Sequence, residues 1–577
     1  MVIAEGNRVS LRTSILSASA GLSGYDIPMS CRAVIARFVP FFLCACALPA
    51  QVTFDRILHA DKEPQNWLTY SGTMNSQRYS TLGQINTNNV KDLQLAWVFQ
   101  ARSTEKFEAT PLVVDGTMYL TQAPNDIVAA DAATGEVKWM YSYLPARDAR
   151  PCCGRVNRGV AILGNTLYMT TIDAHLLAVN AADGKLLWDK EVAKSSSGYA
   201  MTNAPLVVKD KIITGVAGGE FGIRGFIAAY NATTGDEMWR FYTIPGKGEP
   251  GNETWKGDSW EHGGASVWVT GSYDPELNLT YWGVGNPGPD YNSDLRDGDN
   301  LYSDCVVALD ADTGKLKWYF QFTPHDDWDY DAVQVPVLST INWPDGLGKT
   351  QPRKVMMWGN RNGFYYTLDR TTGKFLVGKP FVKVTWAKGL DEAGRPMRSN
   401  DAVPNAKGVD VYPSNAGGTN WYSPSFSPHT GLFYVPAWES VKATFKKIDG
   451  DYQDGKLYMG GAAPGTRPVV TAPQFAKGTD DDGYGMVKAI DPVTGEKKWE
   501  FKMSDVTASG ILTTATDLLF IGGRDGFFQA LDARNGKVLW RVNAGGSTAM
   551  GPMTYQAKGK QYLVFSAGST MFAYALK

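Results

Sequence analysis

The sequence predicts an all-β fold, an eight-bladed β-propeller built from repeats with tryptophan-docking turns. Three observations lead to this prediction. The chain has 577 residues with 61 Gly, 18 Trp, 27 Tyr and 24 Phe, a composition typical of turn-rich β structure. One turn motif recurs along the chain. Alternating apolar runs broken by short turns, such as residues 111–120 and 205–213, lie upstream of the motif.

The recurring motif is Asp/Asn-x-x-x-Gly-x-x-x-Trp. It occurs in seven copies, in one of which an apolar residue replaces Trp, and its glycines are Gly135, Gly184, Gly235, Gly314, Gly373, Gly495 and Gly536. Each copy predicts a tight turn between two strands, with Gly at the position that needs a positive φ. Because the tryptophans recur at one place in the repeat, we interpret them as packing residues between neighbouring sheets.

Each repeat predicts a small antiparallel sheet that cannot bury both of its faces alone, and a ring of such sheets solves this problem. The 122 residues between Gly373 and Gly495 leave room for one blade without the motif, which brings the expected number to eight. Two C-terminal runs, residues 562–566 and 571–576, are expected to close the ring against residues 93–99, so that no sheet edge stays open.

The chain is expected to have three parts. Residues 1–28 carry no pattern and are expected to be a disordered upstream extension. Residues 29–50 are expected to be a signal peptide, with translation starting at Met29, and residues 51–577 the single propeller domain. Export to the periplasm follows from this assignment.

The signal peptide is predicted from its layout. Arg32 and Arg37 precede an apolar run from 38 to 48, and small residues end the segment at Ala50. The run is too short to span a bilayer. A plain disordered N-terminus is one alternative. Residues 43–46 also resemble a lipoprotein cleavage box, which would tether the protein.

Composition excludes several functions. Lys and Arg number 56 against 58 Asp and Glu, so no basic footprint for nucleic acid or a membrane surface is expected. No further stretch is long and apolar enough for a membrane span. The chain has no Cys-x-x-Cys-His haem site and no GxGxxG in a βαβ context, which argues against bound haem and a nicotinamide cofactor.

The acidic stretch at residues 323–331 holds four carboxylates interleaved with aromatic residues, directly after a β-like run. In an extended backbone Asp329 and Asp331 would share one face, with Trp328 and Tyr330 pointing away. Two carboxylates placed in this way repel each other unless a cation lies between them or one is protonated. A solvated acidic loop is the alternative interpretation.

Three cysteines deserve separate interpretations. Cys152 and Cys153 are adjacent, so their Cα atoms would lie about 3.8 Å apart, below the usual disulfide range. Both a strained disulfide, of the kind found at working sites, and two packed thiols remain open; export would permit oxidation. Cys305 is interpreted as a buried thiol.

Glu220 and Asn286 each lie in a glycine-rich turn that lets the backbone approach another group closely. Taken singly, each is equally an ordinary turn residue. Together with Asp329 and Asp331 they supply only hard oxygen donors, which suit a large hard cation and not zinc.

This combination of motifs resembles the pyrroloquinoline quinone-dependent alcohol dehydrogenases, the large subunit of methanol dehydrogenase and its relatives. The resemblance covers residues 61–577. It is carried by the Trp-turn repeats, Cys152-Cys153 with Val156-Asn157-Arg158-Gly159, Gly-Gly-Glu220, Gly-Asn286-Pro and Pro324-His325-Asp-x-Trp-Asp329-Tyr330. It implies an eight-bladed propeller of periplasmic enzymes, with pyrroloquinoline quinone on the axis next to one metal ion.

The resemblance also implies roles for residues. Asp329 would be the catalytic base, and Glu220, Asn286 and Asp329 the metal ligands. A Cys152–Cys153 disulfide and the Trp268 ring would sandwich the quinone. The other implied cofactor-binding residues are Glu108, Arg158, Thr202, Gly218, Gly219, Arg361 and Asn420.

Two positions depart from methanol dehydrogenases, which typically carry Ser at Ala217 and, in many cases, a second Trp at Ala508. These departures put methanol in doubt as the substrate more than they put the chemistry in doubt.

The identity of the metal depends on Asp331. In calcium-dependent relatives this position typically holds a small uncharged residue, and in lanthanide-dependent relatives it holds Asp, so the resemblance favours a lanthanide over Ca²⁺. Glu220, Asp329 and Asp331 would bring three negative charges to one cavity, which a trivalent ion neutralises and Ca²⁺ does not. Gly219 is expected to leave room for the additional ligand.

The function implied is oxidation of a small primary alcohol to an aldehyde, with electrons passing to a separate soluble cytochrome c. A Ca²⁺-dependent dehydrogenase for polyols or aldehydes is an alternative. A non-enzymatic scaffold propeller would share the turns but has no use for the acidic and cysteine motifs. The sequence leaves a homodimer and a small partner subunit open.

Overall fold

A computed structural model describes residues 51–463 and 483–577. The predicted upstream extension and signal peptide therefore lie outside the described residues. From Gln51 onward the chain forms one compact unit. Its one α-helix among the described residues is α1 (Phe54–Leu58). Short 3₁₀ segments are η1 (Ala60–Lys62), η2 (Val90–Asp92), η3 (Ser195–Ser197), η4 (Gly219–Phe221), η5 (Asn252–Thr254), η6 (Ser259–His262), η7 (Ser293–Leu295) and η8 (Asn400–Ala402).

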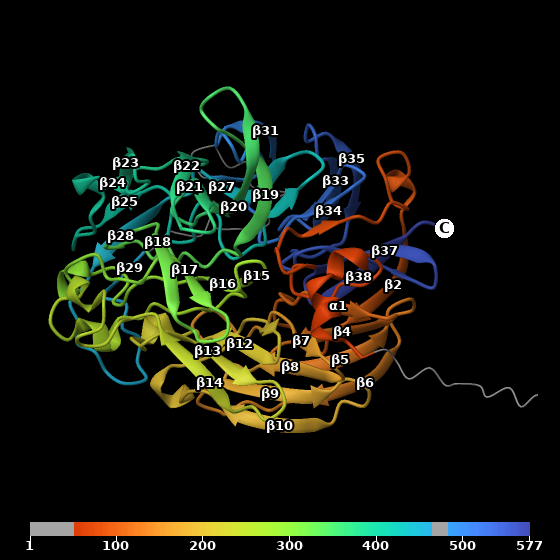
Figure 1. Cartoon of the computed structure of the whole chain (residues 1–577), viewed down its shortest axis with the longest axis horizontal. Coiled ribbons are helices and arrows are strands. Elements are labelled where there is room, and N and C mark those ends of the chain that lie inside the picture. Colours follow the sequence, from red (N-terminus) through yellow and green to blue (C-terminus); the bar gives the residue numbers. More distant parts are fainter. Residues whose placement is uncertain (1–50, 464–482) are drawn as a thin grey trace, which may run out of the picture. The chain divides into compact units, whose positions relative to one another are not determined.

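The rest of the regular structure is β-sheet, as predicted. Six antiparallel sheets of four strands follow one another along the chain, and Figure 1 shows them around a common centre. Their strands are β3 (Leu112–Val114), β4 (Thr117–Gln122), β5 (Asp126–Asp131) and β6 (Val137–Ser142); β7 (Ala161–Leu163), β8 (Thr166–Thr170), β9 (His175–Asn180) and β10 (Leu186–Glu191); β11 (Leu206–Val208), β12 (Lys211–Gly215), β13 (Phe226–Asn231) and β14 (Glu237–Tyr242); β15 (Ser272–Asp274), β16 (Leu279–Gly283), β17 (Cys305–Asp310) and β18 (Leu316–Gln321); β19 (Val337–Pro344), β20 (Thr350–Gly359), β21 (Phe364–Asp369) and β22 (Phe375–Pro380); and β26 (Ser425–Ser427), β27 (Leu432–Glu439), β30 (Tyr484–Ile490) and β31 (Lys497–Lys502).

Strands from the two ends of the chain pair with one another in two further sheets. One is β32 (Leu512–Thr514), β33 (Leu518–Gly522), β34 (Phe527–Asp532) and β35 (Val538–Asn543), to which β1 (Tyr79–Ser80) adds a parallel fifth strand. The other has β2 (Gln94–Gln100) on β38 (Thr570–Ala575), followed by β37 (Lys560–Ala567) and β36 (Met553–Ala557). The antiparallel pairing of β2 with β38 confirms the predicted closure by the C-terminus.

The expectation of a blade without the motif between Gly373 and Gly495 is wrong for the described residues. Among the described residues that interval holds small sheets instead of a motif-free blade, namely β23 (Ala387–Leu390) with β24 (Pro396–Arg398), and β25 (Val409–Val411) with β28 (Ala443–Lys447) and β29 (Gly461–Ala462). The sheet without the motif is the closing one, because its outer strand β2 comes from the other end of the chain and no turn joins β2 to β38.

The turn motif folds for local reasons. In the first copy the Asp131 carboxylate accepts hydrogen bonds from the backbone N–H groups of Ala133 and Thr134, at 2.9 and 3.0 Å, an Asx turn. Gly135 then takes a φ of +74°. The other six motif glycines also have positive φ, as predicted.

Six of the seven motif glycines face indole rings, and Gly495 faces Lys379 and Val377 instead. A Cβ at Gly135 would lie 2.8 Å from the ring of Trp97, and one at Gly184 would lie 2.6 Å from the ring of Trp139. The corresponding pairs are Gly235 with Trp188, Gly314 with Trp239, Gly373 with Trp318 and Gly536 with Trp499. Each indole thus comes from the sheet preceding its glycine, and a side chain at the glycine would displace it.

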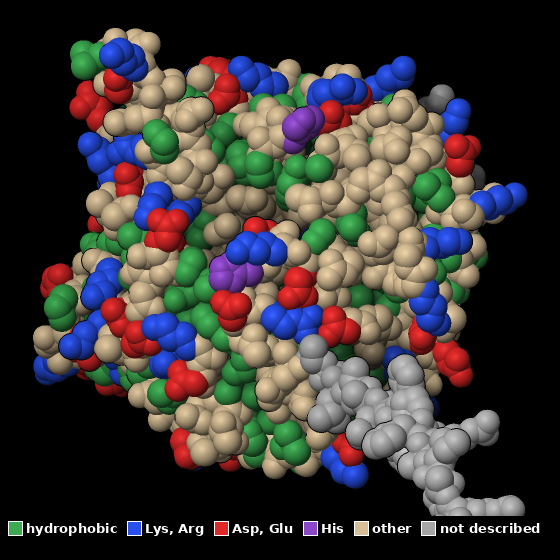
Figure 2. All heavy atoms as spheres, turned by 45° about the vertical axis from the view of Figure 1, so that its right-hand side comes forward, with side chains coloured by type: hydrophobic (Ala, Val, Ile, Leu, Met, Phe, Trp, Pro, Cys, Tyr) green, Lys and Arg blue, Asp and Glu red, His purple; other side chains and the backbone are tan. Residues whose placement is uncertain are grey.

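On the face shown in Figure 2, basic and acidic side chains are interspersed, and neither kind forms a large patch. In the part of the chain that the structure describes, no helix has the length and apolarity needed to cross a membrane.

Candidate functional site

All of the predicted site residues lie in connections at one end of the sheets. Within each sheet, neighbouring strands are antiparallel. The loop that leads into the first strand of a sheet therefore lies at the same end of that sheet as the loop between its second and third strands. Connections into a first strand carry Glu108, Cys152, Cys153, Arg158, Thr202, Trp268, Asp329, Asp331 and Asn420. Connections from a second to a third strand carry Gly218, Gly219, Glu220, Asn286 and Arg361. The Asp-to-Gly turns lie at the opposite end.

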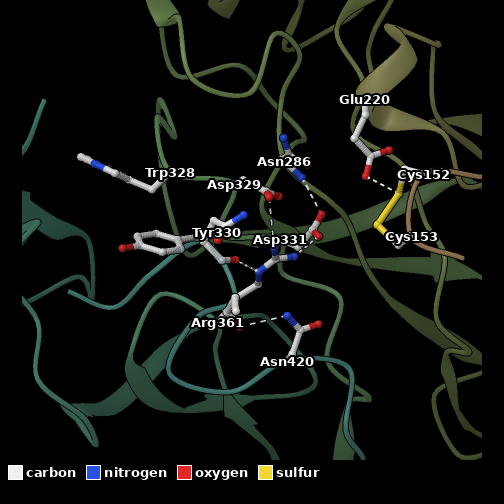
Figure 3. Close-up of polar contacts among 12 residues, drawn as sticks. Cys152, Cys153, Glu220, Asn286, Trp328, Asp329, Tyr330, Asp331, Arg361 and Asn420 are labelled. Carbon is white, nitrogen blue, oxygen red and sulfur yellow. Dashed lines mark hydrogen bonds and ion pairs between the residues drawn. A yellow bond between two sulfur atoms is a disulfide. The ribbon is translucent and has the colours of Figure 1, made fainter. Parts of the chain in front are cut away.

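Asp329 and Asp331 point into one space, but not for the reason expected. The backbone is not extended, because Asp329 has a φ of +61°, a left-handed conformation that is uncommon for residues other than Gly. Trp328 and Tyr330 are fully buried on the other side, with ring centroids 5.7 Å apart. Packing of these two rings therefore turns both carboxylates inward (Figure 3).

Arg361 lies between the two carboxylates. Its Nη2 is 3.1 Å from Oδ2 of Asp329, and its Nη1 contacts Oδ2 of Asp331. The other oxygen of Asp331 accepts the backbone N–H of Asn286 at 3.0 Å. The Arg361 Nε donates to the Asn415 carbonyl at 2.6 Å. One guanidinium thus holds both aspartates in place.

The electrostatics of Asp329 reflect its burial and the charges around it. Burial raises the pKa of Asp329 well above its usual value; Arg361 opposes this, and Asp331, Asp290 and Glu220 add to it. Since like charges close together disfavour ionisation, these carboxyl groups act on one another across the same space.

Glu220 faces the cysteines. Cys152 and Cys153 form a disulfide, which decides between the two alternatives, and Oε1 of Glu220 lies 2.8 Å from the Cys152 sulfur. Burial raises the pKa of Glu220 to about 7, with a smaller contribution from Asp331. Among the described His, Cys, Asp and Glu residues, these three form the one group whose ligand atoms all lie within 4.8 Å of one another. Glu220, Asp329 and Asp331 are therefore not gathered as tightly (Figure 3).

Arg158 contacts three other residues that are predicted to bind the quinone. Its Nη2 pairs with Glu108 at 2.8 Å and its Nη1 donates to the Thr202 hydroxyl at 2.8 Å. The guanidinium lies over the rings of Trp268 and Trp421, 5.1 and 4.6 Å from their centroids. Glu108, Arg158, Thr202 and Trp268 are thus brought together, with Trp421 as an addition that sequence reasoning missed.

The remaining predicted residues have local roles. The Asn420 amide donates to the Ala416 carbonyl at 2.9 Å, and its oxygen accepts the Trp421 N–H. Gly218 has a φ of +115°, and a Cβ there would meet the Gly198 carbonyl at 2.1 Å.

The room at Asp331 comes from a different glycine than expected. A Cβ at Gly219 would meet the Ser266 hydroxyl at 3.2 Å, whereas one at Gly285 would lie 2.4 Å from Oδ1 of Asp331. Gly285 therefore makes space for the Asp331 carboxylate.

Three buried residues near these loops escaped sequence reasoning. Tyr291 donates its hydroxyl to Asp329 at 3.4 Å. Arg296 is fully buried and donates to the carbonyls of Pro289, Asp290 and Asp326. Asp290 is also buried; burial raises the pKa of its carboxyl well above the usual range, and the Asn286 side chain opposes this by a hydrogen bond. Only the proximity of Asp290 and Tyr291 to Asn286 in the sequence could have signalled them.

A ring of β-sheets with a vicinal disulfide, buried carboxylates and the buried arginines Arg158 and Arg361 in the loops at one end defines a class of protein. Residues 67–388 and 501–563 match the family model described as "Glucose/ethanol/alcohol dehydrogenase, beta-propeller domain". The chain belongs to this family, the pyrroloquinoline quinone-dependent alcohol dehydrogenases, and is a β-propeller oxidoreductase.

Particular relatives cover nearly the whole chain. The quinoprotein alcohol dehydrogenase PedH of Pseudomonas putida is 41% identical over 91% of this chain and 90% of its own length. The lanthanide-dependent methanol dehydrogenase of Methylacidiphilum fumariolicum is 36% identical over 89% of this chain and 86% of its own. The solved structure of a europium-containing methanol dehydrogenase has a TM-score of 0.83 at 33% identity, covering 90% of this chain and 100% of that one.

The residues present fit a quinone and a hard cation. The disulfide is exposed and Trp268 is half-buried, so both keep free surface beside Arg158, whose buried Nε lacks a hydrogen-bond partner. An anionic aromatic ligand would meet these needs. For the cation, Glu220, Asn286, Asp329 and Asp331 offer oxygen donors only, the set that Ca²⁺ and similar hard ions prefer.

Proposed function

We propose that this quinoprotein alcohol dehydrogenase oxidises small primary alcohols to aldehydes with a trivalent lanthanide ion beside the quinone, and that Asp329 is its catalytic base. The observation that carries the proposal is the buried pair of Asp329 and Asp331 on one guanidinium, that of Arg361. The names of two relatives, one lanthanide-dependent and one europium-containing, support the choice of metal.

The chain's own residues provide binding, orientation and a proton acceptor. Glu108, Arg158, Thr202, Gly218, Gly219, Arg361 and Asn420 would hold the quinone, with the disulfide and Trp268 on its two faces. When bound, the quinone supplies the acceptor for the hydride of the carbinol carbon, and the metal supplies Lewis acidity.

Asp329 takes the hydroxyl proton of the alcohol at its carboxylate. Arg361 and the Tyr291 hydroxyl hold Oδ2, at 3.1 and 3.4 Å, which fixes the direction of the other oxygen. Burial raises the pKa of the Asp329 carboxyl, and a higher pKa makes its carboxylate a stronger proton acceptor. The proton can therefore move directly from alcohol to Asp329.

The net charge of the site residues affects which metal ion the site would hold. Glu220, Asp329 and Asp331 bring three negative charges, but Arg361 neutralises one, so two remain. A net charge of two suits Ca²⁺ as well as a lanthanide. Ca²⁺-dependent oxidation of alcohols, polyols or aldehydes is therefore the second candidate.

One experiment separates the two candidates. Purified protein is stripped of metal, reconstituted with pyrroloquinoline quinone and either La³⁺ or Ca²⁺, and assayed on a panel of alcohols, polyols and aldehydes with an artificial electron acceptor. We expect La³⁺ to activate primary-alcohol oxidation. Full activity with Ca²⁺ alone and no gain from La³⁺ would establish the Ca²⁺ candidate, and no quinone absorption band after reconstitution would refute both.

We also propose the finer structural and cellular assignments. The seven four-stranded sheets and the five-stranded sheet are taken as eight blades, docked through the indole–glycine contacts. Electrons pass to a separate soluble cytochrome c, because the sequence has no Cys-x-x-Cys-His motif. Residues 29–50 direct the chain to the periplasm and are removed. N-terminal sequencing of the exported protein tests the last point, and stoichiometric reduction of cytochrome c tests the acceptor.

A further inference from the structure

The loop that carries Asp329 holds two residues in an unusual backbone conformation. His325 and Asp329 have φ values of +53° and +61°, in the left-handed region where residues with a Cβ are uncommon. Such conformations cost free energy, and they persist where the surrounding contacts fix the backbone. The contacts that hold residues 323–331 therefore decide where the Asp329 carboxylate lies.

Arg398 supplies several of these contacts. It ends β24, in the insert 387–402 that contains β23, β24 and η8. Its Nη1 donates to the carbonyls of Pro324, at 3.1 Å, and of His325, and its Nη2 pairs with Oδ2 of Asp327 at 2.6 Å. The guanidinium also lies over the Trp328 ring, 4.8 Å from its centroid. One side chain thus contacts four of the five residues directly before the proposed base.

Trp328 is held from further sides as well. Its indole N–H donates to the carbonyl of Ala402, in the same insert, at 2.9 Å. The Asp326 carboxylate accepts the backbone N–H groups of Trp328 and Tyr330 at 2.9 and 2.7 Å. Since Asp329 lies between these two residues in the chain, the direction of its carboxylate depends on where Trp328 is held.

We propose that Arg398 is a positioning residue for alcohol oxidation: it holds residues 324–328 so that the Asp329 carboxylate keeps the direction needed to accept the proton of the alcohol. The inference rests on the proposed role of Asp329 as the base. Without the guanidinium, two carbonyls lose a donor, and the Asp327 carboxylate, 2% exposed, keeps the Ser293 N–H at 3.2 Å. The left-handed conformation at Asp329 is then free to relax.

The test compares wild type, Arg398→Ala, Arg398→Lys and the control Arg353→Ala. Lys keeps a charge beside Asp327 but lacks the planar group that contacts carbonyls, carboxylate and indole together. Arg353 is matched to Arg398, because it pairs with Asp369 at 3.1 Å and lies 5.8 Å from the centroid of the Trp343 ring. Its side chain is 32% exposed, against 23% for Arg398. Asp369 begins one of the Asp-to-Gly turns, at the end opposite the candidate site.

Backbone hydrogen exchange, followed by mass spectrometry on proteins free of metal and quinone, is the first readout. We expect Arg398→Ala to lose protection at the Trp328 and Tyr330 N–H groups while the strands exchange as in wild type. Arg353→Ala should leave this loop unchanged. Unchanged exchange in Arg398→Ala, or equally faster exchange in all the sheets, would overturn the proposal. If Arg398→Ala does not fold, Arg398→Lys carries the same comparison.

Steady-state kinetics after reconstitution with quinone and metal are the second readout. We expect the kcat of Arg398→Ala to fall roughly ten- to hundredfold, as misplacement of a reacting group by about 1 Å can cause. Its KM for the alcohol should stay within about twofold of wild type, the mark of an interaction lost in the transition state. Arg398→Lys should lie between Arg398→Ala and wild type, and Arg353→Ala should match wild type.

The kinetic outcomes separate this inference from the proposed function. Wild-type kcat in the Arg398 variants that fold, or a raised KM at unchanged kcat, would overturn the positioning role alone. Wild-type protein that does not oxidise alcohols after reconstitution would overturn the proposed function, and with it the use of the loop in catalysis.

Discussion

Replacing Asp331 by Ala is predicted to weaken both the fold and the response to lanthanides. The carboxylate pairs with Arg361 through Oδ2 and accepts the Asn286 N–H through Oδ1 at 3.0 Å. Both side chains of the ion pair are buried, with 7% and 8% of their surface exposed. The substitution therefore leaves a buried cation with one partner fewer and an amide with none.

The magnitude follows from these contacts. Breaking a buried ion pair by removing one partner costs about 3–5 kcal/mol. Arg361 keeps its contact with Asp329 at 3.1 Å, so we expect about 3 kcal/mol, the lower end of that range, off the unfolding free energy of the metal-free protein. Asp331→Asn keeps an acceptor for the Asn286 N–H and should lose less, which makes it the matched control.

Two assays check this prediction. Urea denaturation of the metal-free proteins, followed by tryptophan fluorescence, measures the loss of stability. Activation of the quinone-loaded proteins by La³⁺ and Ca²⁺ measures the metal response, which Asp331→Ala should lose for La³⁺. Unchanged stability would refute the energetic role of the Arg361 pair, and an unchanged La³⁺ response would show that Asp331 does not contribute to the metal site.

Three further predictions follow from the same structure. Asp329→Asn should abolish alcohol oxidation, because an amide cannot accept the alcohol proton; more than a tenth of the activity remaining would rule out the base assignment. Mild reduction of the Cys152–Cys153 disulfide should lower activity with an unchanged circular dichroism spectrum, and full activity with both thiols demonstrably free would contradict its role. Trp139→Ala should cost about 3 kcal/mol of unfolding free energy in urea, since the half-buried indole covers Gly184; a loss below about 1 kcal/mol would argue against docking.

Much of the fold could be predicted from the sequence because its determinants are local. The Asx turn at Asp131 and the positive φ at Gly135 depend on residues within four positions of each other. Closure of the ring by residues 571–576 followed from the need to cover a sheet edge. The eighth sheet was misplaced because a long interval between motifs signals only inserted residues, and not whether they form a blade or small sheets.

The sequence by itself determined the repeating turns, the sheet class, the adjacent cysteines and the residue types of the site. Only the tertiary structure decided how the charges are paired, because that depends on which loops the ring brings together. Arg361 lies 30 residues from Asp331, and nothing in the local pattern indicates that it takes up one of the site's charges. The raised pKa of the Asp290 carboxyl is likewise a property of its buried surroundings, because burial disfavours the charged form of a carboxylate.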